Sequence, residues 1–580
     1  MPNPLSIATV CLSGTLDDKL AAAASAGFDG VEIFENDLVG SSWSPKQIRE
    51  RCADLGLSID LYQPFRDFEA VPPDILEANL RRAERKLDLM AELGTDTMLV
   101  CSSVSPDAVD DDDLAAEQLH QLAERAAERG MRIAYEALAW GRFVNTYDHS
   151  WRIVRRAGHP ALGLCLDSFH VLSRGSDPSG IRVIPGDKLF FLQLADAPRL
   201  RMDVLQWSRH HRLFPGQGAF DLTGFVQRVL GTGYAGPLSL EVFNDVFRQS
   251  DPGGTAVDAM RSLLVLKEKL GIGDLPAAPP LAGYALAEVA SNDTGITDTL
   301  AALGFRATHR HGDESVQLWH QGDATLAVRT GATTRITTVG VASTAPEVLL
   351  QRAEHLLAVP AESGVVTPDG TTLTFTAELT DVDGEDNETD LLTGIDHVSL
   401  TAPFDVVDQT ALFYRSVLGL ESEPEAEFAA PFGLVRSLSA SDGRVRIVHN
   451  VAMLRRGEWA PAVPDPQHIA FTTTDAIAAA RAMRARGAPL LDIGDNYYDD
   501  LDARLAPPRL AELRECSVLY DRDEHGEYLH FYTHILGDRV FFEIVQRIGG
   551  YAGYGAVNSP VRMAAHRRER LNANDHRKFR

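Results

Sequence analysis

The chain has 580 residues, five cysteines and a formal net charge of −27 at pH 7. Because a chain of this length exceeds what one hydrophobic core can hold, we expect several domains. The acidic balance argues against nucleic acid as a partner, since phosphate binding needs a basic surface. With no apolar run long enough to span a bilayer and no signal-peptide pattern at the start, we expect a cytoplasmic protein without a membrane anchor.

The first half of the chain alternates short apolar runs with amphipathic helical stretches. The apolar runs are predicted strands, and they begin at Leu5, Gly30, Leu57, Thr97, Arg132, Leu162, Leu189 and Gly236. Continuous apolar runs are typical of parallel strands that are buried on both faces. Eight such βα units in about 270 residues predict an α/β fold, a (β/α)8 TIM barrel over residues 1–272.

The rest of the chain has a different rhythm. Residues 273–283 are rich in Pro and Ala and predict a linker. Shorter, alternating strands with interposed helices follow, so we expect a second domain of α+β class with halves at 284–390 and 391–560. An acidic stretch, TDVDGEDNETD, separates these halves. The last twenty residues, 561–580, hold seven Lys/Arg against two Asp/Glu and predict a basic flexible tail.

The last four predicted barrel strands each carry one oxygen-donating side chain near the carboxyl end. They are Glu136, Asp167, Gln193 and Glu241, at spacings of 31, 26 and 48 residues. Barrel enzymes place their chemistry at this end of the strands, and a carboxylate inside an apolar run is costly without a partner. Three carboxylates and an amide oxygen are hard ligands that suit Mg²⁺, Mn²⁺ or Co²⁺. We therefore predict one metal site at the barrel mouth.

The barrel motifs also carry a family resemblance. The four ligands, with GFDGVEIF, PGQGAFDL and GYAGPLSLEVF, resemble the sugar phosphate isomerase/epimerase superfamily over residues 5–270. Membership implies isomerisation, epimerisation or dehydration beside a carbonyl and does not select among them. The stretches LDSFHVL and QWSRHHRLFPGQG, with the appended domain, are similar to the bacterial two-domain 3-dehydroshikimate dehydratases. That resemblance implies dehydration of 3-dehydroshikimate to protocatechuate in quinate and shikimate catabolism. A keto-sugar or cyclitol isomerase or epimerase is the alternative.

The implied dehydration needs a group that removes a proton beside the ketone. His170 follows the ligand Asp167 by three residues and is the predicted general base, because an imidazole titrates near neutrality. His210 and His211, in the loop after the seventh strand, are competing candidates.

The implied substrate also carries a carboxylate and hydroxyl groups. Arg66 and Arg212 are candidates for the carboxylate, because a guanidinium group binds a carboxylate bidentately. Ser208 is a candidate hydrogen-bond partner of a substrate hydroxyl. The small-molecule substrate is the partner that the sequence predicts, and a homo-oligomer is left open.

The second domain has candidate metal ligands of its own. His397, His468 and Glu543 lie in strand-like runs separated by 71 and 75 residues. Two histidines and a carboxylate form the facial triad that holds non-haem Fe²⁺, and Mg²⁺ is the alternative ion. The domain resembles 4-hydroxyphenylpyruvate dioxygenase, a vicinal-oxygen-chelate protein of paired βαβββ modules, with residues 284–390 as the degenerate half.

One departure from that family concerns its closing segment, GFG-x-GNF, whose two aromatic residues help to enclose the substrate ring. This chain has GYGAVNS, so Tyr554 fits the first aromatic residue and Ser559 replaces the second. The domain is therefore predicted to bind a metal ion without oxidising 4-hydroxyphenylpyruvate. Another dioxygenase activity and a non-catalytic binding or scaffold role are both left open.

Overall fold

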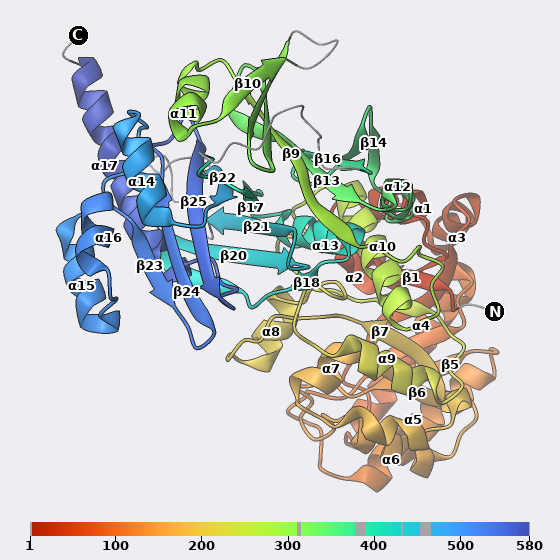
Figure 1. Ribbon diagram of the computed structural model, residues 1–580. Coiled ribbons are helices and arrows are strands. Elements are labelled where there is room, and N and C mark those ends of the chain that lie inside the picture. Colours follow the sequence, from red (N-terminus) through yellow and green to blue (C-terminus); the bar gives the residue numbers. More distant parts are fainter. Residues whose placement is uncertain (1–2, 310–314, 378–389, 431–432, 453–465, 579–580) are drawn as a thin grey trace. The chain divides into compact units, whose positions relative to one another are not determined.

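The chain folds as two compact units, Met1–Leu275 and Pro276–Arg580, in a computed structural model (Figure 1). The structure describes residues 3–309, 315–377, 390–430, 433–452 and 466–578. Apart from its last residue, the acidic stretch that was predicted to separate two halves lies outside these ranges. Within them, no helix has the length and apolar character needed to cross a membrane.

The first unit is a closed barrel of eight strands in chain order. The strands are β1 (Leu5–Ala8), β2 (Gly30–Phe34), β3 (Ser58–Phe65), β4 (Thr97–Cys101), β5 (Arg132–Glu136), β6 (Leu162–Asp167), β7 (Leu189–Leu194) and β8 (Leu238–Leu240). All neighbours are parallel, and β1 pairs with both β2 and β8. The predicted TIM barrel is confirmed, because buried apolar runs, each followed by a helix, close the sheet on itself.

Helices connect and cover the barrel strands. They are α1 (Leu16–Ser25), α2 (Glu35–Gly40), α3 (Pro45–Asp54), α4 (Pro73–Leu93), α5 (Asp112–Ala127), α6 (Tyr147–Ala157), α7 (Ser168–Ser173), α8 (Val204–His210), α9 (Leu222–Leu230) and α10 (Pro252–Lys269). Helix α4 shows how the sequence sets their ends. Its first residue is Pro73, and it stops at Gly94, whose φ of 79° few other residues adopt.

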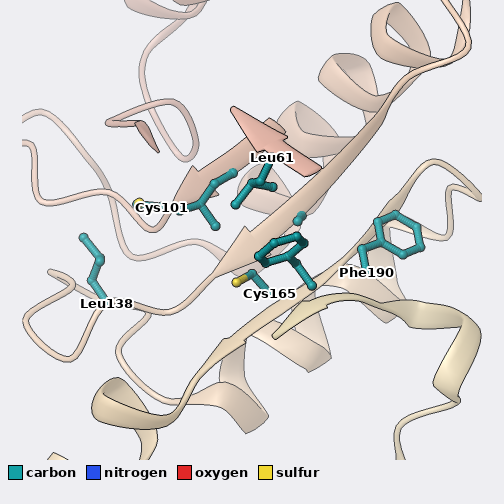
Figure 2. Packing of buried hydrophobic residues seen from close by; sticks show 8 residues of the cluster. Leu61, Cys101, Leu138, Cys165 and Phe190 are labelled. Carbon is teal, nitrogen blue, oxygen red and sulfur yellow. The ribbon is translucent and has the colours of Figure 1, made fainter. Parts of the chain in front are cut away.

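A buried apolar cluster inside the barrel lies next to the predicted ligands. Leu61, Cys101, Leu138, Cys165 and Phe190 belong to it (Figure 2). The cluster reaches the ligands directly, because the Cys101 thiol donates to Glu136 Oε2 over 3.4 Å. At least one predicted barrel ligand, Glu136, is therefore held against the packed core of the barrel.

The second unit contains two mixed sheets. One has the order β10 (Arg306–His309), β11 (Val316–Gln321), β12 (Ala324–Thr330), β9 (Leu281–Ser291), β13 (Arg335–Ser343), β16 (Thr372–Thr376), β15 (Gly364–Val366) and β14 (Val359–Ala361). The other has the order β18 (Glu421–Ser422), β20 (Gly433–Ser441), β21 (Arg446–Ala452), β17 (Gly394–Thr401), β22 (Gln467–Thr472), β25 (Val540–Gly549), β24 (Gly526–Tyr532) and β23 (Leu519–Arg522). A further strand, β19 (Ala426–Ala430), pairs with β20.

Helices accompany both sheets. They are α11 (Gly295–Leu303), α12 (Pro346–His355), α13 (Val407–Leu418), α14 (Ala476–Ala485), α15 (Asp495–Leu505), α16 (Leu510–Cys516) and α17 (Ser559–Lys578). Helix α17 differs from the predicted flexible tail at 561–580. Its Arg562 and His566 are buried, and His566 Nε2 lies 2.9 Å from the carbonyl oxygen of Thr533. Tertiary contacts thus order a segment whose composition suggested a solvated tail.

Candidate metal centres

The carboxylates of Glu136, Asp167 and Glu241 approach one another at the carboxyl ends of β5, β6 and β8. All three side chains are buried. Arg212 joins two of them, with Nη1 at 2.7 Å from Asp167 Oδ2 and 3.1 Å from Glu241 Oε2. His170 joins the third, with Nε2 at 3.5 Å from Asp167 Oδ2 and 3.8 Å from Glu136 Oε1. The structure therefore brings these predicted ligands to one place.

The charge balance of this cluster fits a divalent cation. Three buried carboxylates face the single positive charge of Arg212, while Oε1 of Glu136 has no hydrogen-bond partner among the described residues. Burial raises the pKa of the Glu136 carboxyl well above its usual value, and the charges of Asp167 and Glu241 raise it further. Burial also raises the pKa of Glu241 to about 7. When all three carboxylates are ionised they exceed the charge of Arg212 by two. Without an ion the raised pKa values favour protons on these carboxyls, and an ion of charge +2 would take the place of those protons.

The fourth predicted ligand, Gln193, is held from below by a carboxylate that the sequence reasoning missed. Glu32, buried in β2, accepts a hydrogen bond from Gln193 Nε2 at 2.6 Å and from Gln63 Nε2 at 2.9 Å. The hydroxyl of Ser239 donates to its other oxygen. Since a carboxylate accepts and does not donate, it holds the amide nitrogen of Gln193. The amide oxygen Oε1 accepts from the Cys165 thiol at 3.4 Å, and its second lone pair is the one that a cation would use.

His170 has a defined hydrogen-bonding state. The backbone N–H of Ala139 donates to Nδ1 over 3.2 Å, so in the neutral ring the proton is on Nε2. Burial lowers the pKa of His170 to about 3, and the charge of Arg212 contributes in the same direction. Trp140 and Phe169 pack edge-on against the ring, at centroid distances of 5.0 and 5.9 Å. Arg212 Nη2 also lies 3.4 Å from Nε2, so the Nε2–H group would donate to the carboxylates once this guanidinium has moved away.

A pocket opens above this cluster. Its lining residues are Gln63, Pro64, Arg66, Leu99, Cys101, Glu136, Leu138, Trp140, His170, Ser208, Arg209, Arg212, Glu241 and Phe243. The two predicted carboxylate-binding arginines and Ser208 are thus at the pocket, but Arg212 is engaged inside the ligand set and Ser208 accepts from its Nη2 at 2.8 Å. His210 instead lies close to Asp245, with 2.8 Å between Nδ1 and Oδ2, and its side chain is partly exposed. His211 is not among the pocket's lining residues either.

The predicted ligands of the second unit also converge. His397, His468 and Glu543 lie on the adjacent strands β17, β22 and β25. The two Nε2 atoms are 3.1 Å apart, and Glu543 Oε2 lies 3.4 Å from the first and 3.0 Å from the second. Ligands at right angles and about 2.1 Å from one ion lie about 3 Å apart, so the spacing suits a bound metal ion.

Two ligands of this second centre, His397 and Glu543, have a further partner that orients them. His397 Nδ1 donates to Asp396 at 2.8 Å, which directs the lone pair of Nε2 toward the centre. Asp396 in turn pairs with Arg547 at 2.8 and 2.9 Å. His530 Nδ1 lies 2.7 Å from Glu543 Oε1, so Oε2 remains for the ion. Burial lowers the pKa of the remaining ligand, His468, to about 4, with Arg562 among the charges that add to this shift.

Comparisons with known proteins match both units. Residues 20–267 match the family model of the xylose isomerase-like TIM barrel. A 3-dehydroshikimate dehydratase from Pseudomonas putida is 44% identical over 98% of this chain and 99% of its own length. The chain belongs to the two-domain 3-dehydroshikimate dehydratase family. A relative of the same name from Pseudomonas aeruginosa is 45% identical over 97% of this chain and 98% of its own.

Family membership also accounts for the second unit. A solved structure described as a xylose isomerase-like TIM barrel/4-hydroxyphenylpyruvate dioxygenase fusion protein superposes with a TM-score of 0.91 at 42% identity. It covers 98% of this chain and all of its own. The predicted pairing of a TIM barrel with a dioxygenase-like domain is therefore confirmed for this member of the dehydratase family.

Proposed function

We propose that the barrel dehydrates 3-dehydroshikimate to protocatechuate, with a divalent metal ion held by Glu136, Asp167, Gln193 and Glu241. The observation that carries the proposal is the buried, negatively charged ligand cluster beneath a pocket that also contains cationic side chains. Near-full-length similarity to two proteins named for this reaction supports it. The same reaction would serve quinate and shikimate catabolism. Mg²⁺, Mn²⁺ and Co²⁺ all suit this donor set.

The ion supplies Lewis-acid stabilisation of the negative charge that develops on the ketone oxygen during enolisation. The protein supplies orientation. Arg66 lines the pocket and would bind the substrate carboxylate as a bidentate fork. Ser208 would bind a hydroxyl group, because its oxygen already lies at the pocket wall beside Arg212. When the ion binds, we expect Arg212 to leave the carboxylates and to turn toward the substrate.

Dehydration requires a proton to leave the carbon beside the ketone and a proton to reach the departing β-hydroxyl. His170 presents Nε2–H to the site because Ala139 occupies Nδ1, so we assign the second proton to His170. Glu136 Oε1, 3.8 Å from His170 Nε2, is the acceptor that we assign to the first proton, with Oε2 left to hold the ion. Glu136 passes that proton to Nε2 as the ring gives its own proton to the hydroxyl, so the imidazole stays neutral and the carboxylate is regenerated. The general-base role predicted for His170 would require its bond with Ala139 to break. Loss of water and rearrangement then complete the aromatic ring.

The test is direct. Purified protein mixed with 3-dehydroshikimate and a divalent metal should raise the near-ultraviolet absorbance of a catechol. Chelator treatment should abolish the rise and added metal should restore it. If treated and restored samples are both inert with this substrate, the proposed function is wrong.

For the second centre we propose a bound Fe²⁺ or Mg²⁺ ion held by His397, His468 and Glu543. The ligand spacing and the partners that orient His397 and Glu543 support this proposal. We do not assign oxidation of 4-hydroxyphenylpyruvate to it, because Ser559 replaces the second enclosing aromatic residue. Metal content of the full chain, measured by mass spectrometry, should be two ions in the wild type and one in His468→Ala.

A further inference from the structure

The loop between β3 and α4, residues 66–72, begins with the arginine that we assign to the substrate carboxylate. Arg66 lines the pocket above the barrel ligands. Two other residues of this loop have left-handed backbone conformations, Asp67 with a φ of 55° and Ala70 with a φ of 58°. Such conformations are costly for residues with a side chain and persist only where the surrounding structure enforces them. The contacts that enforce them also set the position of Arg66.

Glu69, in the middle of this loop, makes the most deeply buried of these contacts. It is only 2% exposed. Its Oε1 accepts two hydrogen bonds, one from the backbone N–H of Ser103 at 2.7 Å and one from the hydroxyl of Tyr135 at 2.9 Å. Ser103 follows β4, and Tyr135 lies in β5 next to the predicted ligand Glu136. A single carboxylate oxygen thus ties the loop to two neighbouring barrel strands.

Other hydrogen bonds fasten the loop on either side of Glu69. Asp67 Oδ1 accepts from the backbone N–H of Val104 at 2.9 Å, and the carbonyl oxygen of Ala70 accepts from the N–H of Val109 at 2.8 Å. The guanidinium group of Arg66, by contrast, makes no hydrogen bond or ion pair with any residue that the structure describes. The place from which Arg66 reaches the pocket therefore depends on where the loop holds its backbone.

The Glu69 carboxyl is costly where it stands. Burial raises its pKa to about 7, and its second oxygen, Oε2, has no hydrogen-bond partner among the described residues. A buried acid with an unsatisfied oxygen lowers stability, and such local costs are typical of functional sites. Only Oε1 makes the two bonds to the barrel, so the anchoring needs one acceptor oxygen at this position and not the negative charge.

We propose that Glu69 is a positioning residue, which fixes the strained loop against β4 and β5 and so directs Arg66 at the substrate carboxylate. This inference rests on the proposed function, because that function gives Arg66 its role. Glu69 is not among the residues that line the pocket, so it acts through Arg66 and not on the reacting atoms. Loss of the anchor should therefore weaken substrate binding, which raises KM, and leave kcat nearly unchanged.

Steady-state kinetics of the metal-loaded full chain with 3-dehydroshikimate test this role. Glu69→Ala should raise KM about tenfold and change kcat less than about twofold. Glu69→Gln should restore most of the wild-type KM, because its amide oxygen can still accept both hydrogen bonds. Added to Arg66→Ala, which itself raises KM, Glu69→Ala should raise it no further, because the two residues act in series. Glu77→Ala, at an exposed acid on α4, is the matched control and should leave both constants unchanged.

The proposal is overturned if Glu69→Ala leaves KM unchanged, if kcat falls instead, or if the effects of Glu69→Ala and Arg66→Ala on KM multiply in the double variant. Should Glu69→Ala fail to fold, Glu69→Asp decides, because its shorter side chain cannot reach both donors and its KM must rise.

Hydrogen–deuterium exchange separates this inference from the proposed function. In the Glu69→Ala chain, or in Glu69→Asp in its place, the Ser103 amide should exchange faster than in the wild type, whether or not the barrel turns over. A wild type that is inert toward 3-dehydroshikimate would refute the proposed function, whereas unchanged exchange at Ser103 would refute the anchor.

Discussion

The two candidate metal centres differ in how closely their ligand atoms are already arranged for an ion. In the second unit three ligand atoms lie within 3.4 Å of one another, and Asp396 and His530 hold two of the ligands in place. In the barrel the carboxylates instead hold a guanidinium group, that of Arg212. The centre in the second unit is thus the better arranged for an ion, although the sequence gives less reason to expect catalysis there than in the barrel. The arrangement of ligand atoms indicates only whether a metal ion can bind. Catalysis is indicated by side chains around the ligands that can bind a substrate, such as Arg66 and Ser208 at the barrel pocket.

The largest effect should come from removing a barrel ligand. Asp167→Asn keeps the shape of the side chain but removes a negative charge from the cluster, so dehydration should fall on the order of 10³-fold. His468→Ala, at the other centre, should change the rate less than about twofold. Steady-state rates with 3-dehydroshikimate measure both. If the dehydration rate falls equally in the two variants, the barrel site is not the sole site of dehydration.

His170→Ala should separate the two proton transfers. We expect dehydration to fall about 10²-fold, because the departing hydroxyl loses its proton donor. Exchange of the proton beside the ketone with solvent deuterium, followed by NMR, should continue, because we assign that step to Glu136. If the His170→Ala variant loses deuterium exchange as well as dehydration, His170 and not Glu136 is the general base.

Glu32→Gln should weaken metal binding in the barrel alone. A glutamine at this position no longer forces Gln193 to present its amide oxygen, so we expect affinity to drop about 10–100-fold. Calorimetric titration of the metal-free chain with Mn²⁺ resolves this change. Ser239→Ala, which removes one donor to Glu32 without touching Gln193, is the matched control and should have a smaller effect. An unchanged affinity in Glu32→Gln would show that Gln193 needs no such support.

The smallest effect should follow Asp396→Asn. The asparagine weakens the hold on His397 and the pairing with Arg547, and we expect about tenfold weaker metal binding at the second centre. The dehydration rate should not change. A rate that falls with the second centre's occupancy would indicate that the two units are coupled.

The sequence predicted the fold well because its signals are local. Eight apolar runs followed by helices define the barrel, and an acid or amide near a strand end marks each ligand. Glu32, an acid inside the apolar run GVEIF, carries the same signal on the second strand, outside the last four strands on which the ligand prediction rested. Every acid within a predicted buried strand is therefore a candidate metal ligand or a candidate hydrogen-bond partner of one.

Other features depend on packing that no local pattern reports. Nothing in the loop sequence indicates that Arg212 enters the ligand set, because its place depends on carboxylates from two distant strands. The order of α17 likewise depends on contacts of Arg562 and His566 with β-strands of the second unit, and its basic composition suggested the opposite. The contacts of the two His170 ring nitrogens, with the Ala139 N–H and with Arg212 Nη2, likewise depend on how separate segments pack.

The central claim is that four oxygen ligands of the barrel share one divalent ion. Anomalous diffraction from crystals of the full chain grown with Mn²⁺ tests it most directly. The account predicts a peak about 2.0–2.3 Å from oxygens of Glu136, Asp167, Gln193 and Glu241, with the Arg212 guanidinium moved out of the cluster. Crystals that show manganese only between His397, His468 and Glu543, with Arg212 still bridging Asp167 and Glu241, would contradict it.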